Sequence, residues 1–398
     1  MPKREEIPKR KKVPVAHLKP GIIFDKPVFI DSSSILVDEN VAITEVDIKK
    51  LMTWGIKEVE TLGKEVEPEP EPELIVPKLS LNERQILNQY KDLLRKRKKL
   101  ISVHSEAKSA VREAYGHINL DETFFTDKIK ESVKKIIELL KQNQHVFVFL
   151  YGLKGRENPL VIHSVNVTFY SIILGMALNY NEYELIELGT GAMLIDAGMV
   201  KIPISIRNKE SELTKKEFTQ IKTHPLLGYD ILKRLASASS SVANISLQHH
   251  EQFDGKGYPR GLKGLEISEF ANIVSIADCY EAQVSNRVYK KRVYFHHAMK
   301  NLMSSGVGRF APHLLRTFLS CFSLYPIGSL VELNNKMIGI VIGSSPDKPL
   351  RPIVKLIFDK KRNKVDEIIL INLIEKTDLF IAKALEESDL NINIFDVL

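Results

Sequence analysis

Cysteine is scarce in this 398-residue chain, and long uninterrupted apolar runs are lacking. The two cysteines, Cys279 and Cys321, form no CxxC pair and suggest no disulfide framework, which fits a reducing cytoplasm. The charged N-terminus, with Pro2 and Pro8, lacks the apolar core of a signal peptide. No apolar run reaches about 18 residues, the length that a membrane span requires. We therefore expect a cytoplasmic protein with no membrane span.

Charge of one sign is only slightly in excess. Lysine and arginine number 57 against 50 aspartates and glutamates, so the formal net charge is +7, which suits anionic ligands. The densest basic run, Arg95-Lys96-Arg97-Lys98-Lys99, has no interleaved aromatic residues, so it indicates a solvated helix face rather than a nucleic-acid contact. We expect no nucleic-acid partner, and a homodimer through the helix at 82–115 is a separate hypothesis.

The length suits two or three domains, and four segments precede the motifs that carry chemistry. Residues 1–12 predict a disordered basic tail, and residues 13–63 a small α/β module in which short β-forming runs precede a helix. That helix begins at Thr44, which opens a capping pattern. Residues 64–80 contain a Glu-Pro alternation at 67–72 and predict an extended linker, because proline and like charges resist compaction. Residues 81–150 show helical periodicity and predict a helical connector.

One run combines two histidines, an acid and a glycine-rich turn. It reads His249-His250-Glu251-Gln252-Phe253-Asp254-Gly255-Lys256-Gly257-Tyr258-Pro259. Neighbouring residues on a helix point about 100° apart, so the two histidines cannot serve one metal in the same way. They suit two adjacent ions, or one ion and a supporting contact. The glycines then break the helix and place Tyr258 on a turn that glycine adopts at low cost.

This run resembles the signature of the HD-GYP family within the HD superfamily. Members of that family are metal-dependent phosphodiesterases that act on the bacterial second messenger cyclic di-GMP. The resemblance extends from about Glu157 to Leu319 and implies an HD-type helical domain, which we place at residues 151–324. Residues 325–398 then predict a small C-terminal β module with a terminal helix. The expected fold class is mainly α, with a small N-terminal α/β module and this β module.

The resemblance also implies a set of metal ligands spread along the domain. These are His163, Asp196, His224, His249, His250 and Asp278. Asp196 and Asp278 are the expected catalytic carboxylates. Asp278 stands out independently, because an aspartate beside apolar residues on a buried helix face is costly unless it is paired or binds a cation. Glu281, one turn later, replaces the aspartate usual in the family and keeps the charge on a longer side chain.

The family pattern is incomplete at three positions. Ile195 stands where the histidine of the His-Asp pair belongs, and Met199 where a lysine is frequent. Pro159 occupies the place of a glutamate that some members with three metals carry. The ion that His163, Asp196 and Asp278 would hold therefore lacks its fourth ligand, whereas the ion at the other histidines keeps its set. Mixed histidine and carboxylate ligation favours iron or manganese, so we expect one or two such ions in a weakened site.

A segment after the last ligand resembles the family's phosphate-contacting segment. Arg287 suits a phosphate as a fork and Lys290 as a point charge. Gly257 and Tyr258 complete the expected substrate-binding residues. In the family the Gly-Tyr-Pro turn is also linked to contacts with diguanylate cyclase (GGDEF) domains, which makes such proteins candidate partners.

Two functions fit these residues. The first is a phosphodiesterase that hydrolyses cyclic di-GMP to the linear dinucleotide or GMP with a weakened metal site. The alternative is a catalytically inactive relative that acts as a cyclic di-GMP sensor or protein-interaction adaptor. The retained ligands and basic residues favour the first, and the Ile195 and Met199 replacements favour the second, so we lean to the enzyme. An HD phosphohydrolase of mononucleotides is a third hypothesis, which the Gly-Tyr-Pro turn supports poorly.

Overall fold

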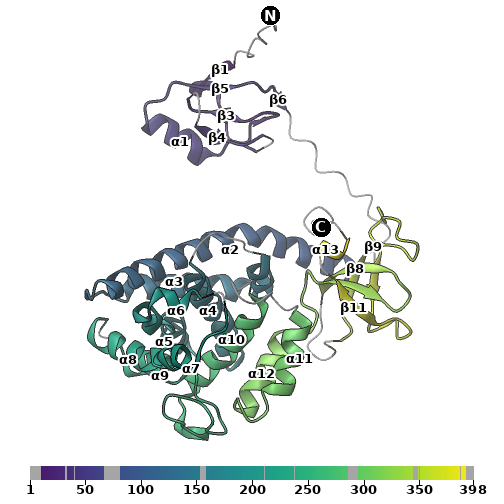
Figure 1. Cartoon of the computed structure of the whole chain (residues 1–398). Helices are drawn as coiled ribbons and strands as arrows, with labels where there is room; N and C mark the ends of the chain where they lie inside the picture. The colour runs from purple at the N-terminus through teal and green to yellow at the C-terminus, as the bar shows by residue number, and fades with distance from the viewer. Residues whose placement is uncertain are drawn as a thin grey trace, which may run out of the picture. The chain divides into compact units, whose positions relative to one another are not determined.

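The structure, a computed structural model of the chain, forms two compact units, residues 1–76 and 77–398, each of which is described by itself (Figure 1). The description covers residues 10–31, 34–39, 41–66, 81–152, 158–209, 211–236, 238–285, 295–343, 348, 350–385 and 387–390.

The first unit is a small antiparallel β structure with one helix. Its elements are β1 (Lys11–Pro14), η1 (Val15–His17), β2 (Ile23–Phe24), β3 (Val28–Phe29), β4 (Ile35–Val37), α1 (Glu45–Thr53), β5 (Glu58–Thr61) and β6 (Glu65–Val66). A four-stranded sheet has the order β1-β5-β3-β4, and β2 pairs with β6. Thr44 caps α1 in a capping box with Asp47, as the sequence predicts.

Two expectations for this unit need correction at their edges. Lys11 and Lys12, which the sequence places in a disordered tail, lie in β1 opposite Thr61 and Glu60. The β6 strand, Glu65–Val66, lies inside the predicted linker and pairs with β2. Both errors have one cause, because these charged residues become strands through pairing with distant partners rather than through their own propensity. The remainder of the predicted tail and linker, residues 1–9 and 67–80, lies outside the described residues.

The second unit is dominated by helices. They are α2 (Leu81–Asn119), α3 (Asp127–Gln142), η2 (Gln144–Gly152), α4 (Pro159–Ala177), α5 (Glu182–Met193), η3 (Ala197–Lys201), α6 (Ile204–Arg207), α7 (Lys215–Ile221), α8 (His224–Arg234), α9 (Ser240–Gln248), η4 (Gly264–Glu266), α10 (Glu269–Val284), α11 (Phe295–Ser305) and α12 (Pro312–Cys321). Capping boxes begin two of them, at Asn181 for α5 and at Thr214 for α7. The mainly α fold class with flanking sheet modules is thus confirmed.

Helix α4 forms the centre of this helical domain. It packs against α2, α5, α10 and α12, and its side chains are buried on nearly every side. Asn158 caps its first turn and Pro159 occupies the first helical position, where a missing N–H costs nothing. Among the described residues, α4 is the one helix long and apolar enough to cross a membrane, but most of it is buried within the protein. Its composition is therefore that of a core helix, and it can carry a polar side chain only where a partner exists.

A five-stranded antiparallel sheet completes the unit. Its order is β10-β9-β8-β7-β11, with β7 (Leu330–Leu333), β8 (Ile338–Gly343), β9 (Ile353–Phe358), β10 (Leu370–Asn372) and β11 (Ile381–Leu385), followed by α13 (Glu387–Leu390). Strand β11 was not expected, since its Ala and Lys residues are weak β-formers that pair with β7. Tyr90 of α2 is buried in the core of this sheet, so α2 contacts both the sheet and the helical domain (Figure 1).

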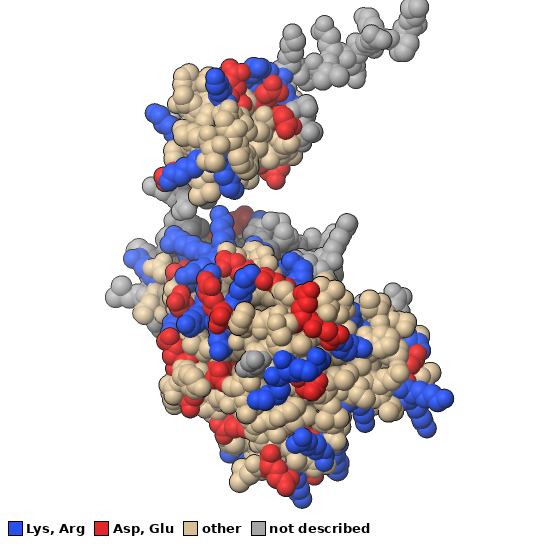
Figure 2. All heavy atoms as spheres, turned by 90° about the vertical axis from the view of Figure 1, so that its left-hand side faces the viewer, with Lys and Arg blue, Asp and Glu red and all other residues tan. Residues whose placement is uncertain are grey.

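The basic run on α2 is partly neutralised. Lys96 pairs with Asp92 at 2.6 Å and also donates to the carbonyl oxygen of Gln142. Lys99 donates to the side chain of the same glutamine. On the face drawn in Figure 2, positive and negative side chains are interspersed rather than separated. These contacts agree with a solvated helix face.

Candidate metal centre

The six side chains predicted as metal ligands come from separate elements of the helical domain. They are His163 within α4, Asp196 between α5 and η3, His224 at the start of α8, His249 and His250 directly after α9, and Asp278 within α10. All six lie in the described part of the chain, and the structure brings them together.

Asp196 stands between two groups of these ligands. One of its oxygens, Oδ1, lies 3.5 Å from Nε2 of His224, and the other, Oδ2, lies 3.7 Å from Nε2 of His163. His163 Nε2 lies 3.0 Å from Oδ1 of Asp278. We call His224, His249 and His250 the histidine half, and His163 with Asp278 the carboxylate half. Asp196 faces both halves with different oxygens, which is the arrangement that a bridging ligand needs.

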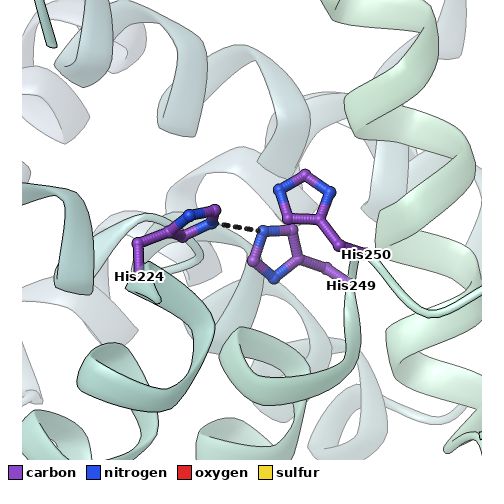
Figure 3. A group of neighbouring side chains, drawn as sticks. All are labelled: His224, His249 and His250. Atoms are coloured by element: carbon purple, nitrogen blue, oxygen red, sulfur yellow. Dashed lines mark hydrogen bonds between the residues drawn. The ribbon is translucent and has the colours of Figure 1, made fainter. Parts of the chain in front are cut away.

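The histidine half is anchored by the backbone. Its three rings each offer a nitrogen within 4.8 Å of the others (Figure 3). The Nδ1 atom of His224 lies 2.7 Å from the carbonyl oxygen of Ile221, and that of His249 lies 2.8 Å from the carbonyl oxygen of Ser246. Because a carbonyl oxygen only accepts, each Nδ1 carries the ring proton, and each Nε2 is left with a lone pair.

Those two lone pairs face each other. The Nε2 atoms of His224 and His249 lie 3.2 Å apart (Figure 3). Burial lowers the pKa of both rings to about 4, so both are neutral near pH 7 and share no extra proton. Two nitrogens that bind the same ion, each at about 2.1 Å from it, lie roughly 3 Å apart. The pair therefore fits a divalent ion, which would remove the repulsion between the lone pairs.

His250 has a different environment from the other two histidines. Its ring stacks on Tyr258, with centroids 4.7 Å apart and planes inclined by 28°. Burial, and then the adjacent His249, lowers the pKa of His250 well below its usual range. Burial, and then the charge of Asp278, raises the pKa of the Tyr258 phenol, which therefore keeps its proton. Tyr258 forms a wall of the site with a hydroxyl that can donate to an anionic oxygen.

The Gly-Tyr-Pro turn depends on glycine, as the sequence predicts. A Cβ atom at Gly257 would lie 2.4 Å from the Cα atom of Glu251, and Gly255 has a φ of +84°. The Glu251 carboxylate is buried and accepts from the backbone amides of Arg260 at 2.7 Å and Leu262 at 3.0 Å. Glu251 thus holds the chain after the turn in place, which is a role that the sequence did not reveal.

The carboxylate half is anchored by side chains instead. The Nδ1 atom of His163 contacts Oε2 of the buried Glu281 in a short hydrogen bond, so its Nε2 is turned toward Asp278 and Asp196. Burial alone would raise the pKa of Asp278, but the hydrogen bond and charge of His163, with the nearby histidines, outweigh burial and hold this pKa well below its usual range. Asp278 is therefore ionised and available to a cation.

The three positions that depart from the family pattern serve the fold. Ile195 is fully buried in the main apolar core, and its carbonyl oxygen accepts from Ser246 at 2.9 Å. The carbonyl oxygen of Met199 accepts from Arg207 at 3.0 Å. Pro159 begins α4. None of these three side chains carries a nitrogen or oxygen, so none replaces the ligand that the family has there.

The predicted phosphate-binding residues Arg287 and Lys290 lie outside the described residues, so their role remains a prediction. A basic residue that the sequence did not single out, Arg309, lies beside the site. Its carbonyl oxygen accepts from Phe253 in the double-histidine loop at 2.8 Å. Burial and groups closer to these side chains have the larger effects on the pKa of His250 and of Tyr258, and the charge of Arg309 lowers both. Its buried Nε has no hydrogen-bond partner among the described residues.

A second cation, Lys222, lies at the same wall. Its Nζ atom lies 5.0 Å from the ring centre of Tyr258 and 5.0 Å from that of Phe218. The sequence pattern of α7 predicts that Phe218 faces inward, but Phe218 is exposed. The Phe218 ring lies beside the Lys222 ammonium instead of entering the core. Positive charge thus gathers beside Tyr258.

Two domain families match this chain. Residues 149–314 match the HD domain, and residues 330–393 match a KOW domain associated with the HD domain. Bd1817, described as an HDG"Y"P protein from Bdellovibrio bacteriovorus, covers 78% of this chain and 98% of its own, with 16% sequence identity and a TM-score of 0.49.

Curated relatives match the chain over much of its length. Cyclic di-GMP phosphodiesterase PA4108 of Pseudomonas aeruginosa is 31% identical over 261 residues, which cover 66% of this chain and 63% of that protein. Cyclic di-GMP phosphodiesterase PdeB of Borreliella burgdorferi is 30% identical over 238 residues, which cover 59% of this chain and 62% of that protein. The chain therefore spans about three fifths of the length of these relatives. The resemblance seen in the sequence is confirmed: this is an HD-domain protein whose relatives are named cyclic di-GMP phosphodiesterases.

Proposed function

We propose that this protein is a metal-dependent phosphodiesterase that hydrolyses cyclic di-GMP to the linear dinucleotide or GMP. The observation that carries the proposal is the position of Asp196, whose two oxygens face His224 on one side and His163 on the other. One carboxylate with imidazoles on both sides suits two adjacent divalent ions. The names of the curated relatives support cyclic di-GMP as the substrate.

The donor set fits the metal. His224 and His249 direct unprotonated Nε2 atoms toward one point, and Asp278 and Asp196 offer carboxylates nearby. When bound, divalent ions lower the pKa of a water molecule and polarise a phosphate oxygen. We propose iron or manganese, since imidazole nitrogens mixed with carboxylates suit both metals.

The wall beside the ligands suits the phosphate of the substrate. Tyr258 keeps its hydroxyl proton and can donate it to a phosphate oxygen. Lys222 and Arg309 place positive charge next to this ring, and the buried Nε of Arg309 lacks a hydrogen-bond partner among the described residues. A guanidinium in this position is suited to a phosphate by geometry as well as by charge. We propose that Arg287 and Lys290 add to this phosphate site.

The remaining assignments follow from the same proposal. The protein would act in the cytoplasm. GGDEF-domain proteins are candidate partners at the Gly-Tyr-Pro turn, and a homodimer through α2 remains a hypothesis. The division into a tail, an accessory module, a linker, a helical connector, an HD domain and a C-terminal β module is likewise retained as a proposal.

The test is turnover of cyclic di-GMP by protein purified without oxygen and reconstituted with Fe²⁺ or Mn²⁺. Asp196→Ala removes the carboxylate that faces both halves and is expected to abolish turnover. Asp230→Ala is the matched control, because Asp230 is an exposed aspartate of α8 whose ion pair, with Arg234 at 3.5 Å, lies outside the site. Wild-type protein that binds cyclic di-GMP and metal without turnover would reject the enzyme and favour the sensor or adaptor.

A further inference from the structure

A buried line of polar side chains joins α2 to the carboxylate half. His104 Nε2 lies 2.9 Å from Asn166 Oδ1, and Asn166 Nδ2 lies 3.1 Å from Glu281 Oε1. The other oxygen of Glu281 contacts Nδ1 of His163. All four side chains are buried, and they come from three helices, α2, α4 and α10. The line crosses the centre of the helical domain and ends at a proposed metal ligand.

The direction of each hydrogen bond in this line is set by chemistry. A carboxylate can only accept, so Asn166 must turn its amide nitrogen toward Glu281. The amide oxygen of Asn166 then faces His104, whose Nε2 must carry a proton. Ser285 donates to the same oxygen of Glu281 as Asn166, Oε1, and His163 contacts Oε2, so both oxygens of this carboxylate have donors. Glu281 is thereby fixed in position, and it accepts the Nδ1 proton of His163.

The polar residues of this line stand where apolar ones would otherwise pack. On α2, the buried residues next to His104 on the same face are Leu100, Val103 and Ala107. Polar groups in such surroundings are tolerated only when they are fully hydrogen-bonded. An apolar side chain at position 104 would leave the buried amide oxygen of Asn166 without its donor, so the amide would hold Glu281 less firmly.

We propose that His104, Asn166 and Glu281 are positioning residues that hold the His163 ring with its Nε2 presented to the metal, which makes α2 part of the metal centre. This inference rests on the proposed function only in requiring that His163 binds a metal. Contacts that orient a histidine ligand through its second nitrogen commonly change metal affinity by about 10–100-fold when they are removed. In the histidine half, backbone carbonyls serve the same purpose.

The test measures Mn²⁺ binding by the full chain. Electron paramagnetic resonance reports the free Mn²⁺ during the titration, and thermal unfolding is measured on the same variants. His104→Leu is expected to lower the Mn²⁺ affinity of the weaker of the two expected sites by about tenfold. His104→Gln should restore the affinity, because its amide nitrogen can donate to Asn166 in place of the imidazole Nε2. Thr168→Val is the control, since Thr168 is a buried residue of α4 whose hydroxyl donates to the Ser164 carbonyl oxygen within the same helix. It should change stability without changing Mn²⁺ affinity.

Two results would overturn the proposal in distinguishable ways. If His104→Leu binds Mn²⁺ as the wild type does while His163→Ala loses a site, the line is merely structural and the ligand assignment survives. If His163→Ala itself retains every Mn²⁺ site, the ligand assignment behind the proposed function is wrong as well. Should His104→Leu fail to fold, Asn166→Asp replaces it: this change sets a second carboxylate against Glu281, and unchanged Mn²⁺ affinity in that variant would equally reject the proposal.

Discussion

The histidine half and the carboxylate half solve one problem by different means. Both must fix imidazole rings so that a chosen nitrogen points inward, toward the proposed ion. The histidine half uses the carbonyl oxygens of Ile221 and Ser246, which belong to the helical turns that carry the histidines. The carboxylate half uses Glu281, which lies 118 residues from His163 and depends on further side chains. A side-chain substitution can therefore disturb the carboxylate half far more easily than the histidine half.

The replacement at Ile195 falls on the more vulnerable half. By the family pattern, a histidine at this position would add a ligand beside Asp196, and Ile195 is instead fully buried in the apolar core. The histidine half is anchored by the carbonyl oxygens of Ile221 and Ser246, and position 195 meets it through the backbone, where the Ile195 carbonyl oxygen accepts from Ser246. We therefore expect one metal site of high affinity, in the histidine half, and one of low affinity, in the carboxylate half.

The largest effect is expected at His249. His249→Ala removes one of the two facing nitrogens and should lower turnover by more than about 100-fold, since loss of a ligand exceeds loss of a contact that merely orients one. His163→Ala, in the weaker half, should cost less. Measuring Mn²⁺ content and turnover of both variants side by side tests the order.

The control for this pair is His313→Ala. His313 is an exposed histidine of α12 that lies 3.6 Å from Glu269, and its loss should leave Mn²⁺ content and turnover unchanged. Equal losses for His249→Ala and His163→Ala would contradict the division into a strong and a weak half.

A gain is expected from Ile195→His. This change restores the residue of the family pattern next to Asp196 and should tighten the weaker Mn²⁺ site by about 10–100-fold, which corresponds to roughly 1.4–2.8 kcal/mol. The same change exchanges a fully buried apolar side chain for a polar one, so the free energy of unfolding should fall without metal and recover when Mn²⁺ is added. Mn²⁺ titration and thermal unfolding with and without the ion measure both effects.

Ile195→Gln provides the comparison for that variant. It brings a polar group of similar reach but no imidazole, so it should reproduce the loss of stability without the gain in affinity. Unchanged affinity in Ile195→His would mean that the weaker site does not include position 195, and that the departure from the family pattern has no consequence for the metal.

The sequence indicated which side chains come together better than what holds them in place. The six candidate ligands follow from the family resemblance, and the start of the helix at Thr44 follows from local capping. Strands β1 and β11 were missed or cut short, since their residues are weak β-formers whose partners lie far along the chain. The pairing of Asn166 with Glu281 spans 115 residues and was hidden for the same reason.

Arg309 illustrates the same limit and provides the smallest predicted effect. It follows a glycine in the turn between α11 and α12, with no periodicity or motif to mark it, and only the contact of its carbonyl oxygen with Phe253 brings it to the double-histidine loop. Because it lies outside both halves, Arg309→Ala should leave Mn²⁺ affinity unchanged. It should raise the KM for cyclic di-GMP by about tenfold, the magnitude of one hydrogen bond to a charged group, with little change in kcat.

Arg316→Ala is the matched control for Arg309, since Arg316 is an exposed arginine of α12. Steady-state kinetics of the two variants at saturating Mn²⁺ separate substrate contact from metal contact. A fall in Mn²⁺ affinity in Arg309→Ala would place this guanidinium within the metal centre. The residues proposed to bind phosphate would then not be distinct from those proposed to bind metal. If the KM of Arg309→Ala equals that of Arg316→Ala, Arg309 does not bind the phosphate. Lys222 and Tyr258 would then be the remaining candidates, because Lys222 is the cation that contacts the Tyr258 ring among the described residues.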